Sequence, residues 1–201
     1  MSARRLVPLS GIVTVAAIFA SFAIVGDTPD TDAPINEVVS FYTKHDGDAQ
    51  FSGALSALAA LMFLIFSSTV AGVLRRAEGD PGGASALAYG GGILFAAGGA
   101  IFAGLSFTIG DTVKDIDLAS LQTLHVLSED LFFPVAVGTV AFLLGAGIGV
   151  VKTGVLPKWL GWAAIVVALV GITPIGFVSF PALGLWTLVV SVMLFMRADT
   201  A

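Results

Sequence analysis

The sequence predicts an all-α fold, a polytopic membrane protein built as a six-transmembrane-helix bundle with a short amphipathic outer helix. Three observations lead to this prediction. Hydrophobic residues make up 57% of the 201 residues and charged residues only 11%, less than half of the roughly 25% that is usual in soluble domains. The mean hydropathy is +0.98. The apolar residues are also gathered into six runs that contain no Lys, Arg, Asp, Glu or His. We therefore expect a single transmembrane domain over 1–201.

The six runs give the expected spans. Four of them reach the length of about 20 residues with which an α-helix crosses a bilayer. The last two lie in a charge-free stretch too long for one helix, and the prolines at 174 and 181 predict a break between them. That break, over 173–181, is either a simple turn or a re-entrant bend. The expected spans are about 6–25, 51–74, 84–109, 131–151, 159–175 and 180–196.

Basic residues predict the orientation of the chain. Seven of the nine Lys and Arg residues fall on one side of the expected spans, and only Lys44 and Lys114 fall on the other. Short cytoplasmic loops carry an excess of Lys and Arg. We therefore expect both the N and the C terminus in the cytoplasm, with most acidic residues on the outer face.

Small residues recur every four positions along the third run. Such spacing places them on one helix face, where a second backbone can approach closely. We therefore expect this helix to be central in the bundle. The residues are Ala88, Gly92, Ala96, Ala100 and Gly104.

The loop between the first two spans is long enough to carry structure. Ile35, Val38, Val39 and Tyr42 repeat with the i, i+3, i+4, i+7 pattern of an amphipathic helix. We expect a short helix there, across the outer mouth of the bundle or on the lipid surface. It is interpreted as a connector that shields the bundle, with a gating lid as the alternative.

A candidate metal site lies on the same outer side. His125 and Glu129 are four residues apart, so on a helix an imidazole and a carboxylate would share a face. His45, at the end of the first outer loop, could join them, and these ligand types suit zinc. The hypothesis is therefore a site formed by His125, Glu129 and His45. The alternative is that these are solvated residues at the end of a transmembrane helix.

Several function classes are disfavoured by what the sequence lacks. There is no cysteine, which removes disulfides and thiolate metal sites. The expected spans contain no ionisable residue, although proton relays and ion pathways usually need one. Both histidines lie outside the spans, so a haem held by two histidines within the bundle is excluded. No particular cofactor is indicated, and no nucleic-acid partner is expected at a net charge of -5.

Two segments resemble a known group of proteins. Residues 154–162, Gly-Val-Leu-Pro-Lys-Trp-Leu-Gly-Trp, follow a Gly-rich run. They resemble the G-x-L-P-[RK]-W-L-G cytoplasmic turn of a bacterial family of six-span membrane proteins classed as a domain of unknown function. Residues 36–42 and 72–76 are similar to the first half of such proteins in high-GC Gram-positive bacteria. The resemblance implies a multi-pass protein of the bacterial plasma (inner) membrane and carries no known activity.

These observations lead to one main hypothesis and two alternatives. The chain is expected to be a non-enzymatic membrane protein, either a small-ligand or lipid-binding bundle or an accessory subunit of a membrane complex. Its expected partners are the lipid bilayer and another membrane protein or a second copy of itself. The alternatives are a metal-dependent membrane enzyme with an outer-face His/carboxylate site and a passive channel or transporter.

Overall fold

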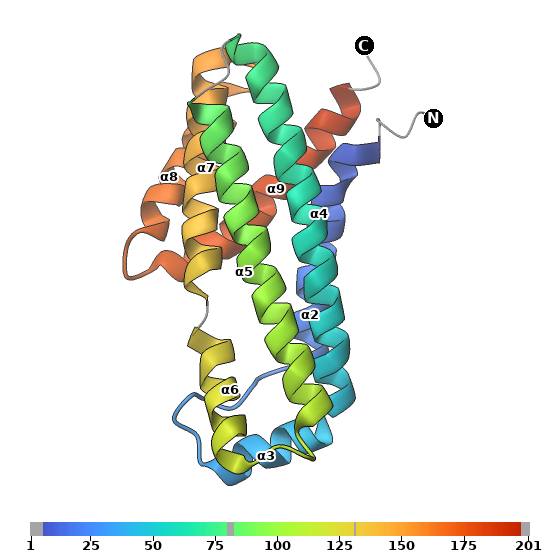
Figure 1. Cartoon of the computed structure of the whole chain (residues 1–201). Coiled ribbons are helices and arrows are strands. Elements are labelled where there is room, and N and C mark those ends of the chain that lie inside the picture. The colour runs from blue at the N-terminus through green and yellow to red at the C-terminus, as the bar shows by residue number, and fades with distance from the viewer. Residues whose placement is uncertain (1–5, 80–82, 131, 198–201) are drawn as a thin grey trace.

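The computed structural model describes residues 6–79, 83–130 and 132–197, without the side chains of 129 and 130. Every regular element in this part of the chain is a helix (Figure 1). The elements are η1 (Val7–Leu9), α2 (Ser10–Val25), α3 (Ile35–Lys44), α4 (Asp46–Glu78), α5 (Ala84–Thr112), α6 (Leu118–Asp130), α7 (Phe133–Thr153), α8 (Lys158–Gly171), η2 (Gly176–Val178) and α9 (Ser179–Arg197).

Five stretches of the described chain are long and apolar enough to cross a membrane. They cover 7–25, 46–78, 84–112, 118–153 and 176–197. The helix α4, with 33 residues, is about 50 Å long at 1.5 Å per residue. Since hydrocarbon is about 30 Å thick, its polar ends extend past the apolar run at 51–74. The chain is thus a multi-pass helical membrane protein by length and composition.

The fifth expected span is shorter than the sequence predicts. The apolar run at 159–175 forms a helix, α8, of only 14 residues, or about 21 Å. It ends at Gly171, because a residue that precedes a proline, here Thr173 before Pro174, is disfavoured in the α region. The structure therefore identifies five candidate spans, and the count of six stays a prediction.

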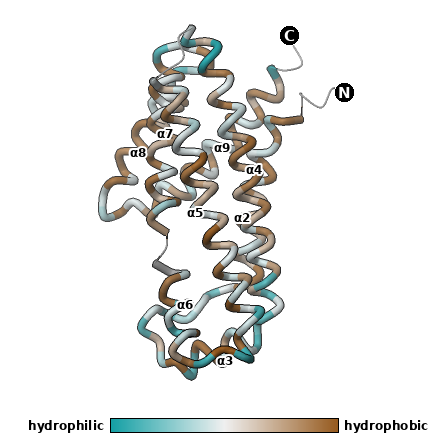
Figure 2. Tube along the Cα trace, in the orientation of Figure 1, coloured by the Kyte–Doolittle hydropathy of each residue, from teal (hydrophilic) through white to brown (hydrophobic). Residues whose placement is uncertain are grey.

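The helices form an elongated bundle with its two ends built differently. Figure 1 shows α4 and α5 running side by side along its length, with α3 and α6 gathered at one end and both described chain ends at the other. Figure 2 shows hydrophobic residues along the shaft and hydrophilic residues concentrated at the α3/α6 end and at the turn between α4 and α5. This distribution matches a shaft in hydrocarbon with two polar ends in water.

Glycines allow α5 and α7 to pack backbone against backbone. A Cβ at Gly91 would overlap the backbone of Phe142, and one at Gly138 would overlap the backbone of Phe95. A Cβ at Gly145 would likewise overlap the backbone of Ala88. Close approach of this kind is what small residues allow between membrane helices. The α5–α7 interface therefore tolerates no side chain at these glycines.

The four-residue stripe on α5 describes this packing only in part. Ala88, Gly92 and Ala96 are buried, but Ala100 and Gly104 are exposed. The close contacts instead use glycines seven residues apart, which follow the helix face better than a spacing of four over several turns. The helix α5 contacts α3, α4, α6 and α7, but α4 and α7 each contact four α-helices as well. The structure therefore does not single out α5 as the central helix.

A cluster of aromatic side chains fills the centre of the bundle. Phe63 and Phe66 of α4 contact Phe142 of α7 with ring centroids 5.1 and 6.1 Å apart. Trp186 of α9 meets Phe142 edge to face, and its indole N–H donates a hydrogen bond to the Leu160 carbonyl of α8. These contacts join α4, α7, α8 and α9 into one packed side.

Candidate functional site: three cavities along α2

The predicted site residue His125 lies in the interior of the α3/α6 end. Its side chain is 0% exposed. The Nε2 atom is 3.3 Å from the carbonyl oxygen of Asp30, and the Nδ1 atom is 3.2 Å from the hydroxyl of Tyr42. Because a carbonyl only accepts, Nε2 donates to Asp30, and in the neutral imidazole Nδ1 then accepts from the Tyr42 hydroxyl. The interpretation of His125 as a solvated residue is therefore wrong, since the loop before α3 and α3 itself cover the ring.

The other two predicted metal ligands are placed differently. His45 is half-buried at the end of α3, where its Nδ1 lies 2.9 Å from the carbonyl oxygen of Phe41 and its ring packs on the Phe41 ring. The side chain of Glu129 is outside the described part of the chain. The described residues contain no group of three or more His, Cys, Asp or Glu that could hold a metal ion. The metal hypothesis stays a prediction without a contact to support it.

A small second core fastens α3 to the rest of the bundle. Val38 and Tyr42 of α3 are buried against Ile109 of α5 and Leu121 of α6. This burial accounts for the apolar face that the sequence predicts for the helix at 35–44. The helix α3 is thus packed on protein across the end of the bundle.

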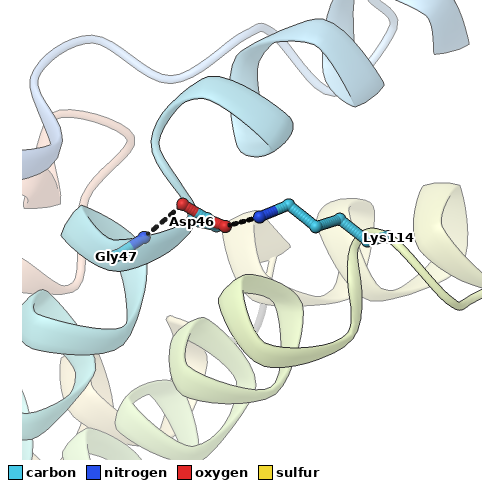
Figure 3. A network of polar contacts seen from close by, with 3 residues as sticks. All are labelled: Asp46, Gly47 and Lys114. Carbon is cyan, nitrogen blue, oxygen red and sulfur yellow. Dashed lines mark hydrogen bonds and ion pairs between the residues drawn. The ribbon is translucent and has the colours of Figure 1, made fainter.

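Two polar contacts hold the same end. Lys114, after α5, pairs with the Asp46 carboxylate at the start of α4, and that carboxylate also accepts a hydrogen bond from the backbone N–H of Gly47 (Figure 3). Asp117 caps α6 by accepting hydrogen bonds from Ser120 and Ala119. The hydrogen bond from the Ser120 hydroxyl is the main cause that lowers the pKa of Asp117 below its usual value, and the one from the Ser120 backbone N–H adds to it.

The largest of three cavities along α2 lies between α2 and α9. Its volume is about 270 Å³, and we call it the inner cavity. Phe63 of α4, Phe95 of α5 and Phe180 of α9 line it together with Ile18 of α2. Phe22, which also lines it, is 56% exposed. An apolar chain in the bilayer could therefore reach the inner cavity from the side of the bundle.

A second cavity continues the first toward the α3/α6 end. This middle cavity, of about 70 Å³, shares Ile18, Phe22, Phe95 and Phe180 with the inner cavity. Its remaining walls come mainly from α4 and α5, including Ser56. The shared residues make the two cavities neighbours on one face of α2.

The third cavity is the most polar of the three and lies under α3. We call this cavity, of about 100 Å³, the vestibule. It shares Phe22 and Phe102 with the middle cavity but is lined by hydroxyl side chains from six segments. These are Ser21, Thr28, Tyr42, Ser52, Ser106 and Ser128.

The three cavities follow one another in the same order along three helices. On α2 the vestibule, middle and inner cavities are lined in turn by Val25, Ser21 and Thr14. On α4 the order is Ser52, Ser56 and Phe63, and on α5 it runs from Ser106 through Gly99 to Phe95. On α4 and α5 hydroxyls thus give way to phenyl rings along the line, although Thr14 of α2 and Thr187 of α9 also line the inner cavity.

The sequence alone does not reveal the cavities. Thr14, Ser106 and Thr187 stand out as polar residues within apolar runs, yet nothing local shows that they line a common space. One sequence signal does exist on α4, where Ser52 and Ser56 share a face with Phe63.

Comparison of the chain with family models, with curated proteins and with solved structures gives no match.

Proposed function

We propose that this chain is a membrane protein that binds a small apolar or lipid-like ligand inside its helix bundle and catalyses no reaction. The observation that carries the proposal is the apolar inner cavity of about 270 Å³ and its continuation into the middle cavity. Cavities lined by aromatic and aliphatic side chains stay dry and take up apolar ligands. A hydrocarbon chain placed there gains dispersion contacts that empty space forfeits.

The alternatives find less support in these contacts. A channel or passive transporter needs a continuous polar path, whereas phenyl rings line the inner cavity. A metal-dependent enzyme would need free ring nitrogens, whereas both nitrogens of His125 have partners. An accessory subunit of a membrane complex remains an alternative that predicts copurifying protein chains.

The proposal includes a topology. The chain would cross a bacterial plasma membrane six times, with both termini in the cytoplasm and α3 outside. The first and last described residues lie at one common end of the bundle in Figure 1. The described basic residues on that side also support this topology; they are Arg75, Arg76, Lys152, Lys158 and Arg197. The helix α8 is too short to cross the membrane alone, so the turn after it and η2 would complete the fifth crossing.

Single cysteines test this topology, because the natural chain has none. Thr31→Cys, before α3, should react with a membrane-impermeant maleimide in intact cells. Thr153→Cys, at the end of α7, should react only after the membrane is opened. The reverse pattern, or equal labelling of both in intact cells, would reject the topology and leave the cavity untouched.

Native mass spectrometry tests the ligand. The full chain is purified in mild detergent, incubated with total lipid extract of its expression host and released gently into the gas phase. The wild type should retain an apolar adduct of defined mass. Gly184→Leu should lose the adduct, because Gly184 lines the inner cavity and a Cβ there meets only Val15, at 3.9 Å.

Gly90→Leu is the matched control. Gly90 is an exposed helical glycine with nothing within 4 Å of an added Cβ, and it lines none of the three cavities. This variant should keep the adduct. A wild type without any adduct, or an adduct equally retained in Gly184→Leu, would contradict the proposed function.

A further inference from the structure

The vestibule is the most polar of the three cavities and lies at one end of their line. Its six hydroxyl side chains come from α2, the loop after it, α3, α4, α5 and α6. A hydroxyl both donates and accepts hydrogen bonds, so this wall can serve a ligand group of either kind. Four of the six have partners already. Ser128 donates to the His125 carbonyl and Ser21 to the Ile18 carbonyl, the Tyr42 hydroxyl lies 3.2 Å from Nδ1 of His125, and Thr28 has a partner within the protein. The remaining two are Ser52 and Ser106.

Charge decides which polar group fits. No Lys, Arg, His, Asp or Glu is among the described residues that line the three cavities. A carboxylate or phosphate buried without a cationic partner costs several kcal/mol, whereas a hydroxyl or carbonyl needs only a hydrogen bond. The vestibule therefore favours a neutral polar group over an anionic one.

The size of the cavities decides how many chains fit. Along α2 the cavities extend from Gly26 to Thr14, roughly 18 Å at 1.5 Å per residue. This length is close to one leaflet, about half of the 30 Å hydrocarbon thickness. The inner cavity, at about 270 Å³, is near the lower end of the usual range for ligand sites, about 300–1,000 Å³. One chain fits this shape better than two.

We infer that the ligand is a neutral single-chain amphiphile, whose hydroxyl or carbonyl end occupies the vestibule and whose chain extends toward Thr14 and Thr187. Long-chain alcohols, isoprenoid alcohols and monoacylglycerols have this chemistry. The inference rests on the proposed function, because it assigns a substrate class to the same line of cavities. Free fatty acids and two-chain phospholipids are the classes it excludes.

Two photoreactive probes test the polar end. One is a long-chain alcohol and the other the matching fatty acid, each with a diazirine in mid-chain and an alkyne at the tail. Each probe is bound to the full chain in nanodiscs at neutral pH, crosslinked and quantified. The alcohol should label α2 and α4 saturably, and at least about tenfold more than the acid, because several kcal/mol of unpaired charge exceed the 1.4 kcal/mol that a factor of ten represents.

Matched serine variants locate the polar end. Ser52→Ala removes a buried vestibule hydroxyl and should weaken alcohol binding about three- to tenfold, the range expected for one hydrogen bond. Ser68→Ala, on the same helix but exposed and away from the cavities, should leave it unchanged. Equal effects of both variants, or none from Ser52→Ala, would overturn the inference.

A charge added to the vestibule provides a gain-of-function test. Ser106 lines the vestibule and is half-buried, so Ser106→Lys places an ammonium group beside the polar end. The preference should then reverse, with the acid labelling more than the alcohol in protein that still elutes as a single species. If folded Ser106→Lys protein still prefers the alcohol, the inference is wrong. If Ser106→Lys does not fold, the result for Ser52→Ala decides the inference.

The two proposals fail in different ways. If Gly184→Leu abolishes labelling but alcohol and acid label the wild type equally, the cavity binds apolar chains and only the neutral-head inference is wrong. If Gly184→Leu leaves labelling by both probes intact, the proposed function itself is wrong.

Discussion

On one side of the bundle α5 and α7 meet backbone to backbone, whereas on the other side α2 and α9 enclose a cavity of about 270 Å³. Both sides contain glycines. At Gly91 an added Cβ would overlap the backbone of Phe142, but at Gly184 it would meet only Val15, at 3.9 Å. The comparison separates a packed scaffold from a side that can accept a ligand. Substitutions that add the same side chain to each side test this difference.

The largest expected effect is that of Gly91→Leu. Forcing α5 and α7 apart should destabilise the fold by at least about 3 kcal/mol, the upper end of the usual cost of overpacking. Unfolding in mixed micelles with increasing dodecyl sulfate measures this cost. Gly90→Leu, one residue along and exposed, is the control and should be nearly neutral. A Gly91→Leu protein as stable as Gly90→Leu would contradict the packed scaffold.

The next effect concerns the cover of the vestibule. Tyr42→Phe removes the hydroxyl that donates to Nδ1 of the fully buried His125. An unsatisfied buried acceptor costs about 1–3 kcal/mol, so α3 should exchange its amide hydrogens faster while α7 stays protected. Tyr89→Phe, at an exposed position on α5, should change neither. Unaltered exchange in α3 would show that this contact does not hold the cover in place.

A smaller effect of opposite sign is expected for Gly184→Leu without ligand. Replacing a glycine within a helix removes an entropic penalty of about 0.5–1 kcal/mol, and the new side chain enters empty space. The variant should therefore unfold at slightly higher dodecyl sulfate than the wild type. A marked destabilisation would mean that the inner cavity is closed in solution and that α2 packs as tightly as α5 and α7 do.

The smallest expected effect on stability is that of lowering the pH. Hydrogen bonds lower the pKa of Asp117 in the folded chain, so its stabilising contribution is complete above the unfolded pKa of about 3.9. It is lost as the pH falls through the lower folded value. Hydrogen exchange at Ala119 and Ser120 should rise there while α5 and α7 are unaffected. Asp117→Asn should remove this pH dependence and Asp115→Asn should retain it.

The sequence predicts the packed side better than the open side. The apolar runs at 84–109 and 131–151 predict the bounds of α5 and α7 to within a few residues, because a helix in hydrocarbon must be apolar along its length. The glycines that join the two helices are visible too, although a spacing of four describes them only in part. The run at 159–175 misleads, because apolar composition alone does not show that the helix ends at Gly171.

The cavities and the burial of His125 depend on distant contacts. His125 is covered by Asp30, 95 residues earlier in the chain, so its neighbours along α6 give no sign of it. The inner cavity exists because α2 and α9, at opposite ends of the sequence, cross without filling the space between them. Hydropathy and spacing identify which residues are apolar or hydroxylated, but they do not show which of them face one another.

The most direct test of the ordered line of cavities uses two alcohol probes that differ only in the position of the diazirine. A diazirine next to the hydroxyl should crosslink to peptides that contain Ser52 and Ser106. A diazirine at the far end of the chain should crosslink to peptides that contain Thr14 and Thr187. The crosslinked positions within these peptides are read residue by residue. If both probes label the same residues, or only exposed ones such as Leu58 and Phe107, the ligand does not lie along α2 and the account is wrong.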